Sequence, residues 1–264
     1  MHFHARLSTT LASVAWLAFA SLATGCASLG QTDERETAAR QAKAHLAIGA
    51  DHLKNGRIAL ALREFLVAEK FDSRNAEVQN ALGEGYFAQN KRVEAEAHYR
   101  RAIELDPDYH DARLSLSVLH IVEERYAEAA AECQTLIDDP TFPAPWRALA
   151  NLGFAELQQK NLIEARKHLT LALEYQKEYW PATLTLAQLE LRENRKREAL
   201  SLLRDVLSLS PAPAVQAQAN YQIAEIYVSL GQREQAVAHL TTAVAQTPDG
   251  LWGRRSEEYL KQLR

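Results

Sequence analysis

Residues 76–109 read AEVQNALGEGYFAQNKRVEAEAHYRRAIELDPDY, and this stretch decides the fold. Apolar and small residues recur every three or four positions on both sides of Asn90-Lys91, which is the spacing of two amphipathic helices joined by a polar turn. Asparagine in such a turn can adopt the left-handed conformation that ends a helix. Pro107 closes the second helix, because the residue before a proline disfavours helical geometry. The stretch therefore predicts a helical hairpin.

The same pattern recurs along the chain in columns of equivalent residues. A small residue in the first helix of each hairpin and an alanine in the second helix share the spacings 34, 34, 36, 34 and 37, and a large residue follows the alanine by four positions. Small residues let paired helices approach closely, and stacked hairpins bury apolar stripes that one hairpin cannot bury alone. The columns are Gly49, Gly83, Ser117, Gly153, Ala187 and Ala224 (small); Ala61, Ala95, Ala129, Ala165, Ala199 and Ala236 (alanine); and Phe65, Tyr99, Cys133, Leu169, Leu203 and Leu240 (large).

This pattern resembles the tetratricopeptide repeat, a helical hairpin of about 34 residues. The resemblance implies an all-α fold, a right-handed superhelical solenoid of six helix pairs with a C-terminal capping helix. Because this repeat is a general binding scaffold, it also implies a protein partner. The expected organisation is a signal peptide at 1–25, a tether at 26–41, repeats at 42–75, 76–109, 110–143, 146–179, 180–213 and 217–250, and the cap at 251–264.

The connections between the helices are also marked. Two proline-rich insertions, 138–145 and 210–214, are expected to open wider turns between hairpins. In the cap, Trp252, Tyr259, Leu260 and Leu263 are expected to cover the last repeat. Within the hairpins, polar turns are expected at Asn55-Gly56, Asn90-Lys91, Glu123-Glu124, Lys160-Asn161, Asn194-Arg195 and Gly231-Gln232.

The N-terminus has the order of features found in a bacterial lipoprotein signal. Arg6 follows two histidines, and the largely apolar stretch 11–23 is too short for a membrane-spanning helix, which takes about 20 apolar residues. Leu22-Ala23-Thr24-Gly25-Cys26 then resembles a lipobox, with cleavage between Gly25 and Cys26 and lipid attachment at Cys26. An ordinary secretory signal followed by a chance cysteine is the alternative.

Lipidation at Cys26 would place the protein on a membrane. Two or more acyl chains anchor a protein stably, at about 0.8 kcal/mol for each buried methylene. Ala27 follows the cysteine, and the resemblance to lipoproteins implies outer-membrane sorting, with the chain on the periplasmic face. A flexible tether over 26–41 would place the repeats roughly 20 Å from the lipid.

Composition and motifs exclude several classes of function. The chain has 30 basic and 34 acidic residues and a net charge of −4, so it lacks the basic excess typical of nucleic-acid binding. No metal-ligating histidine motif, phosphate-binding glycine loop or nucleophile elbow occurs. Cys133 fits a buried apolar position better than a reactive thiol, and Arg192 to Arg197 fits a solvated charged turn. We expect no catalytic residue, cofactor, metal or small-molecule substrate.

A partner is expected to bind a groove lined by the first helices of the hairpins. Taking the small column as position 8 of the repeat, positions 2, 5, 9, 12 and 13 face this groove in the family. Positions 5 and 12 can instead pack against the neighbouring repeat. The mainly apolar lining suits an amphipathic helix or an extended hydrophobic segment. The expected groove residues are Asn80, Glu84, Phe87, Leu114, Val118, Ile121, Phe154, Leu157, Leu184 and Leu191.

The junction at residues 136–153, LIDDPTFPAPWRALANLG, is similar to the corresponding junction in type IV pilus pilotins of the PilF/PilW/Tgl family. These proteins also combine a lipobox, a short tether and six repeats. The resemblance implies an outer-membrane lipoprotein that binds the pilus secretin and promotes its outer-membrane targeting and multimer assembly, for pilus biogenesis and twitching or gliding motility. A repeat lipoprotein that serves as a scaffold for cell-envelope or peptidoglycan enzymes is the alternative, and an enzyme with an unrecognised site is a third.

Overall fold

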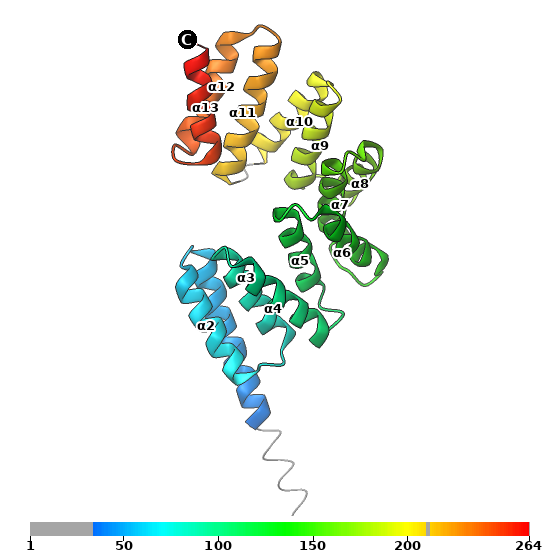
Figure 1. Ribbon diagram of the computed structural model, residues 1–264, viewed down its shortest axis with the longest axis vertical. Helices are drawn as coiled ribbons and strands as arrows, with labels where there is room; N and C mark the ends of the chain where they lie inside the picture. Colours follow the sequence, from blue (N-terminus) through cyan, green and yellow to red (C-terminus); the bar gives the residue numbers. More distant parts are fainter. Residues whose placement is uncertain (1–33, 210–211, 264) are drawn as a thin grey trace, which may run out of the picture. The chain divides into compact units, whose positions relative to one another are not determined.

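The computed structural model describes residues 34–209 and 212–263, and every regular element in these ranges is a helix. The chain divides at Tyr109 into two compact units, so that unit 1 is described over 34–109 and unit 2 over 110–263 apart from 210–211. The helices follow one another as hairpins, each with a first and a second helix (Figure 1). The all-α fold of paired helices is therefore confirmed.

Unit 1 contains two hairpins and unit 2 contains four, followed by a single helix. The N-terminal helix, which is helical from 34 to 54, belongs to unit 1. Unit 1 also contains α2 (Ile58–Phe71), α3 (Ala76–Ala88) and α4 (Arg92–Leu105). Unit 2 contains α5 (His110–Val122), α6 (Tyr126–Asp138), α7 (Pro145–Gln158), α8 (Leu162–Tyr175), α9 (Trp180–Arg192), α10 (Lys196–Ser208), α11 (Pro213–Ser229), α12 (Arg233–Gln246) and α13 (Leu251–Gln262).

The core is a series of clusters shared between successive hairpins. In unit 1, Phe65 of the first hairpin packs in one cluster with Val78 and Leu82 of α3. In unit 2, Ala172 of α8 and Ala182 of α9 are fully buried in another. Since each cluster takes side chains from consecutive hairpins, stability depends on the contact between neighbours, as in other repeat proteins.

A close contact between paired helices connects the small and large columns. A Cβ atom added to Gly49 would lie 2.3 Å from the ring of Phe65, and one added to Gly153 would lie 2.7 Å from Leu169. These spaces exclude any side chain, so a residue without Cβ lets the large side chain reach the backbone of the first helix. The remaining pairs follow the same register: Gly83 with Tyr99, Ser117 with Cys133, Ala187 with Leu203, and Ala224 with Leu240.

The six expected hairpin turns are confirmed by their backbone geometry. Each contains one residue with a positive φ, and the next residue donates its N–H to the carbonyl five residues earlier, as Lys91 does to Tyr86 at 2.9 Å. This bond is the one that closes a helix through a left-handed residue. The positive-φ residues are Gly56, Asn90, Glu124, Lys160, Asn194 and Gly231, with φ between 59° and 73°.

In four hairpins, a hydrogen-bonded polar pair also connects the two helices, each time between residues nineteen positions apart in the sequence. In the first, His45 Nδ1 donates to the Glu64 carboxylate at 2.7 Å, nineteen residues later. Because these groups are partly buried, each hydrogen bond satisfies polar atoms that would otherwise lose water. Residues with the same separation form the other three pairs: Gln79 with His98, Arg113 with Glu132, and Asn220 with His239.

Two helices begin earlier than expected. Residues 34–41, expected in the tether, are helical. Their sequence, ERETAARQ, consists mainly of strong helix formers, although it is polar and has no apolar stripe of the kind that marks a helix in a sequence. Helix α11 begins at Pro213, although the sixth repeat was expected from 217. Proline suits the first position of a helix because its missing N–H has no partner there.

The last helix of the chain covers the final hairpin, as expected. The rings of Trp252 and Tyr259 lie 5.3 and 6.0 Å from the ring of Tyr221 on α11. Leu260 and Leu263 pack against the cluster formed by α11 and α12. The charged residues of α13, including Arg254, Glu257, Glu258 and Lys261, remain exposed. This helix therefore closes the apolar end of unit 2 with a polar outer surface.

Candidate partner-binding groove

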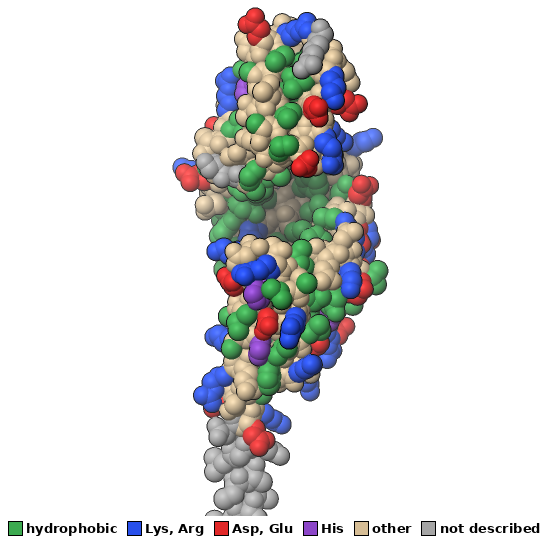
Figure 2. Space-filling view, turned by 90° about the vertical axis from the view of Figure 1, so that its left-hand side faces the viewer, with side chains coloured by type: hydrophobic (Ala, Val, Ile, Leu, Met, Phe, Trp, Pro, Cys, Tyr) green, Lys and Arg blue, Asp and Glu red, His purple; other side chains and the backbone are tan. Residues whose placement is uncertain are grey.

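The first helices of three hairpins in unit 2 expose apolar side chains on the expected side. Val118 and Val122 of α5 are 37% and 44% exposed. Ile121 of α5, Phe154 of α7 and Leu191 of α9 are half-buried. Figure 2 shows one face of the molecule, on which hydrophobic side chains lie among charged ones. We call these five residues the apolar groove residues.

Three of the expected groove residues in unit 2 do not line a surface. Leu114, Leu157 and Leu184 are buried, each in a core cluster with residues of the adjacent helices. These leucines occupy positions 5 and 12, where the side chain fills the space between hairpins. The prediction that they line the groove is therefore wrong for this structure, because their apolar surface is already covered by the fold.

Of the three groove residues expected in unit 1, one is buried and two are half-buried. Asn80 is buried, and its side-chain amide donates to the carboxylate of Glu84 at 3.1 Å, one turn later on α3. Glu84 and Phe87 are half-buried. Asn80 thus orients Glu84 rather than presenting its own amide, so of these three expected residues Glu84 and Phe87 are the two that a partner could reach.

Phe154 is the central aromatic residue of the apolar groove in unit 2. It follows Gly153, whose lack of a side chain seats Leu169 against α7. The ring of Tyr126, at the start of α6, meets the ring of Phe154 at an interplanar angle of 63° and a centroid distance of 6.4 Å. An edge-to-face contact of this kind holds a ring in place, so Phe154 offers a partner a preorganised apolar surface.

Polar groups flank the apolar groove residues on α7 and α9. The Arg192 guanidinium donates to the carbonyl of Leu157 and, at 2.8 Å, to the side chain of Gln158. These bonds join the end of α9 to the end of α7 and fix an exposed cation beside Leu191. The half-buried Gln188, one turn earlier on α9, adds an amide that can both donate and accept. The groove therefore combines an apolar floor with a polar border.

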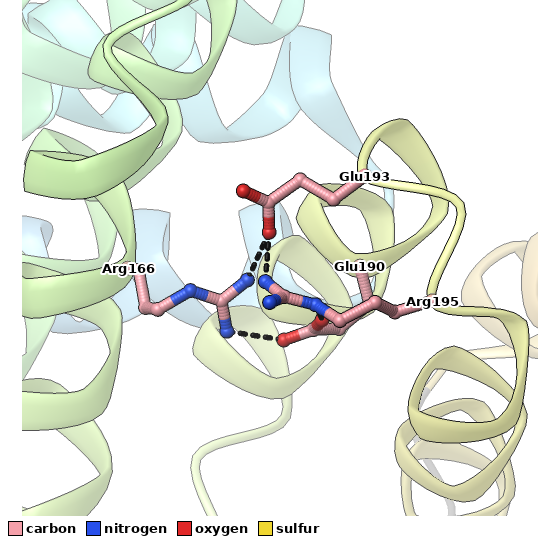
Figure 3. Close-up of polar contacts among 4 residues, drawn as sticks. All are labelled: Arg166, Glu190, Glu193 and Arg195. Carbon is pink, nitrogen blue, oxygen red and sulfur yellow. Dashed lines mark hydrogen bonds and ion pairs between the residues drawn. The ribbon is translucent and has the colours of Figure 1, made fainter.

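An ion cluster near the turn between α9 and α10 was not expected (Figure 3). Arg166 of α8 and Arg195 both bind Glu190, whose side chain is only 6% exposed, and both also bind Glu193. Residues 192–197 were predicted to form a solvated turn, but Glu193 and Arg195 are tied to α8 and α9 by this cluster. A nearly buried carboxylate with two guanidinium partners fixes the packing of these hairpins.

Cys133 and the polar pair of His168 and Glu156 serve packing. Cys133 is fully buried, and its burial raises the pKa of the thiol to about 12, so the reactive thiolate is absent at neutral pH. His168 Nδ1 donates to Glu156 at 2.8 Å, in a pair that joins α8 to α7. Gly25 and Cys26, the predicted cleavage and lipidation residues, lie outside the described residues. Over 34–209 and 212–263, no helix is long and apolar enough to span a bilayer.

Comparison with known families and sequences relates the chain to other repeat proteins. Two tetratricopeptide repeat models match it, one at residues 46–110 and the other at residues 86–152 and 191–254. Type IV pilus assembly protein PilF of Pseudomonas aeruginosa is 26% identical over 177 residues, which cover 64% of this chain and 69% of PilF. Type II methyltransferase M.CeqI of Rhodococcus hoagii is 31% identical over 170 residues, 57% of this chain, so the chain spans a third of that enzyme.

Solved structures show the same arrangement of helices. The structure of Pseudomonas aeruginosa PilF matches with a TM-score of 0.68 and 19% identity, over 85% of this chain and 99% of that one. The pilus biogenesis factor PilW matches with a TM-score of 0.69 and 20% identity, over 81% and 97%. The Cut9–Hcn1 complex matches with a TM-score of 0.74 and 20% identity, over 84% of this chain and 43% of that one. These similarities concern the fold.

Proposed function

Since the chain belongs to the tetratricopeptide repeat family and is related in sequence to PilF, we propose that it acts in type IV pilus biogenesis as an outer-membrane pilotin. In this role it binds the pilus secretin and promotes the targeting of that protein to the outer membrane and its assembly into a multimer. The observation that carries this proposal is the sequence relation to PilF, which extends over more than two thirds of PilF.

The groove supplies the chemistry that such a role needs. A secretin subunit on its way to a membrane exposes apolar segments, and Val118, Phe154 and Leu191 offer an apolar surface that can cover one of them. Each apolar side chain that the partner buries contributes about 1.5–3 kcal/mol. Association costs about 4–15 kcal/mol in lost translational and rotational freedom. A few such contacts do little more than offset this cost, so we expect weak, reversible binding, which suits a factor that hands over its partner.

The lipid anchor supplies the location. Cleavage after Gly25 would leave Cys26 as the first residue, and acylation there would hold the repeats at the periplasmic face of the outer membrane. The match to the methyltransferase covers a third of that enzyme, and our proposal includes no catalytic activity.

Deletion of the gene tests the proposal. We expect the heat-stable secretin multimer to disappear from membranes while secretin monomer remains, and re-expression of the wild-type chain to restore it. A chain with Cys26→Ser should lose labelled palmitate and leave the membrane fraction, and should restore the multimer poorly. Normal multimer in the deletion strain would rule out the pilotin role.

A further inference from the structure

A positive charge is fixed beside the apolar groove residues of unit 2. Arg192 follows Leu191 at the end of α9, and its side chain remains exposed. Its guanidinium donates to the carbonyl of Leu157 and to the side chain of Gln158, which lies one helical turn after Phe154 on α7. Both acceptors are neutral. These bonds therefore hold the guanidinium in position without cancelling its charge, and they use only two of its N–H groups.

The carboxylates closest to Arg192 in the sequence bind other partners. Glu190 and Glu193 bind Arg166 and Arg195 in the ion cluster (Figure 3), in which two carboxylates meet two guanidinium groups. The charges of this cluster balance one another. Over residues 110–209 and 212–263, no carboxylate bonds to Arg192. Its positive charge is therefore available to a partner.

The other charged residues around the groove do not offset this charge either. Glu156 on α7 accepts a hydrogen bond from His168, and Glu225, exposed on α11, interacts with Arg255 of α13. Lys160, exposed in the turn after α7, adds a further cation. The border of the groove at the ends of α7 and α9 is therefore positively charged. Two further carboxylates on α5 and in the turn after it are paired: Asp111 with Arg147, and Glu123 with Arg125.

The repeat itself does not require a cation where Arg192 stands. Arg192 occupies position 13 of its hairpin, and the other hairpins of unit 2 have Val122, Gln158 and Ser229 at this position. All three are neutral, and their hairpins pair in the same way. The arginine is therefore a feature of the groove at α9 and not of the hairpin.

A partner that covers Phe154 and Leu191 also removes water from the Arg192 guanidinium. Burying a charge without a partner is unfavourable, whereas a carboxylate that bonds to the guanidinium offsets the lost hydration. We propose that the groove of unit 2 selects an acidic amphipathic helix, in which an aspartate or glutamate binds Arg192 while apolar side chains cover Phe154 and Leu191. This inference rests on the proposed function and names the chemistry of the partner segment.

The spacing of the groove favours a helix over an extended segment. Helices α7 and α9 are in direct contact through the bonds of Arg192, and packed helices lie about 8–10 Å apart. Side chains about seven positions apart on a partner helix are separated by about 10.5 Å, close to this interval. On one face of an extended segment, side chains recur about every 7 Å. Because Gln158 lies one turn after Phe154, the carboxylate is expected about three or four positions from the residue that covers Phe154.

Matched synthetic peptides test the proposal without the secretin. Each peptide is an amphipathic helix of about 18 residues with a leucine stripe, and the three peptides differ only in a glutamate, glutamine or lysine one turn from the central leucine. In fluorescence anisotropy titrations of the purified full chain, we expect the glutamate peptide to bind at least tenfold more tightly than the lysine peptide. Arg192→Glu should reverse this order, which a loss of packing alone would not do.

Two further variants complete the test. Arg197 is exposed on α10, the second helix of the same hairpin, so Arg197→Glu makes the same charge change outside the groove and should keep the wild-type order. Arg192→Gln should remove the difference between the peptides without reversing it. Circular dichroism checks that helical content is kept, and Arg192→Gln decides the question if Arg192→Glu does not fold.

A folded Arg192→Glu or Arg192→Gln chain that still prefers the glutamate peptide would overturn the proposal. Equal binding of the three peptides to the wild-type chain, or no binding of any of them at about 1 mM, would also overturn it. The secretin multimer is measured separately in the deletion strain. The preference for an acidic helix can therefore fail while the pilotin role holds, and the reverse outcome is distinguished in the same way.

Discussion

The Tyr99 ring of α4 lies against Gly83 of α3, so close that a Cβ atom on Gly83 would come within 2.5 Å of two ring carbons. Alanine would gain about 1 kcal/mol in helix propensity over glycine. Displacing a buried ring from a packed core costs about 1–3 kcal/mol, and the ring is held on its other sides. The net effect lies between about 0 and 2 kcal/mol, and because the ring is confined we expect Gly83→Ala to lower the free energy of unfolding by up to about 2 kcal/mol in urea titrations.

Gly85 provides the matched control on the same helix. A Cβ atom there would meet Cδ1 of Leu62 at 3.1 Å and a ring carbon of Phe65 at 3.3 Å, both more distant than the ring carbons at Gly83, and the Leu62 methyl group ends a flexible side chain that can move aside. Gly85→Ala should therefore be neutral or mildly stabilising. If Gly83→Ala proves as stable as Gly85→Ala, the close approach of α3 and α4 is not what holds this hairpin together.

In the hairpin turns, a change to glycine is expected to stabilise the protein. Glu124 has a φ of 59°, a left-handed conformation that costs a residue with a Cβ atom about 1 kcal/mol. Glu124→Gly should raise the free energy of unfolding by about 0.5–1 kcal/mol, although glycine also gains entropy in the unfolded chain. Gly231, at the equivalent position with a φ of 73°, supplies the reverse test. Gly231→Ala should destabilise by about 1 kcal/mol, and unchanged thermal midpoints for both variants would refute this account of the turns.

The ion cluster in unit 2 should respond strongly to the loss of its buried member. Glu190→Ala removes the nearly buried carboxylate from Arg166 and Arg195, which are 35% and 42% exposed and keep Glu193 as a partner. The loss should therefore be smaller than for a fully buried pair, about 1.5–3 kcal/mol, as for a hydrogen bond to a charged group. Glu193 shares the same partners but is more exposed, so Glu193→Ala should cost less than about 1 kcal/mol. Chemical denaturation of the two variants checks the difference, and similar losses would mean that burial of Glu190 is not decisive.

Acid should weaken the loop between the third and fourth hairpins of the chain. His110 donates from Nε2 to Asp139 at 2.7 Å, and this bond, with two more from Thr141, lowers the pKa of Asp139 from 3.8 to about 2. A lowered pKa means that the contribution of Asp139 is complete above pH 4 and is lost as the pH falls to 2. Wild type should therefore be more stable than Asp139→Asn at pH 5, and the two unfolding midpoints should converge near pH 2. A difference that stays constant with pH would contradict this.

Periodicity was enough to predict the hairpins and their turns. Gly49, Gly83 and Gly153 mark close approaches that only small residues permit, so their spacing follows the fold directly. Helix starts were harder to predict, because residues 34–41 have strong helix propensity but no apolar stripe to mark it. The same limit applies at Pro213, which was assigned to a turn although proline is also favourable at the first position of a helix.

The groove was predicted only in part, and the reason is geometric. Whether Leu157 faces the groove or the next hairpin depends on how far successive hairpins rotate, and the sequence of one repeat does not define that rotation. Glu190 and Arg166 come together through the contact between two hairpins, so no periodic pattern in the sequence predicts that they pair. Two of the polar pairs had a usable signal, because His98 and His239 recur at the same place in the second helix.

The central claim is that the apolar groove in unit 2 binds the secretin, and one variant tests it most directly. Phe154→Glu puts a charge where the partner should bury an apolar group, and Ile163→Glu puts one on α8 at a residue that is 83% exposed and outside the groove. In a binding titration with purified secretin, the account predicts at least a tenfold rise in Kd for Phe154→Glu, with helical content unchanged, and none for Ile163→Glu. Wild-type affinity in the folded Phe154→Glu chain would contradict it.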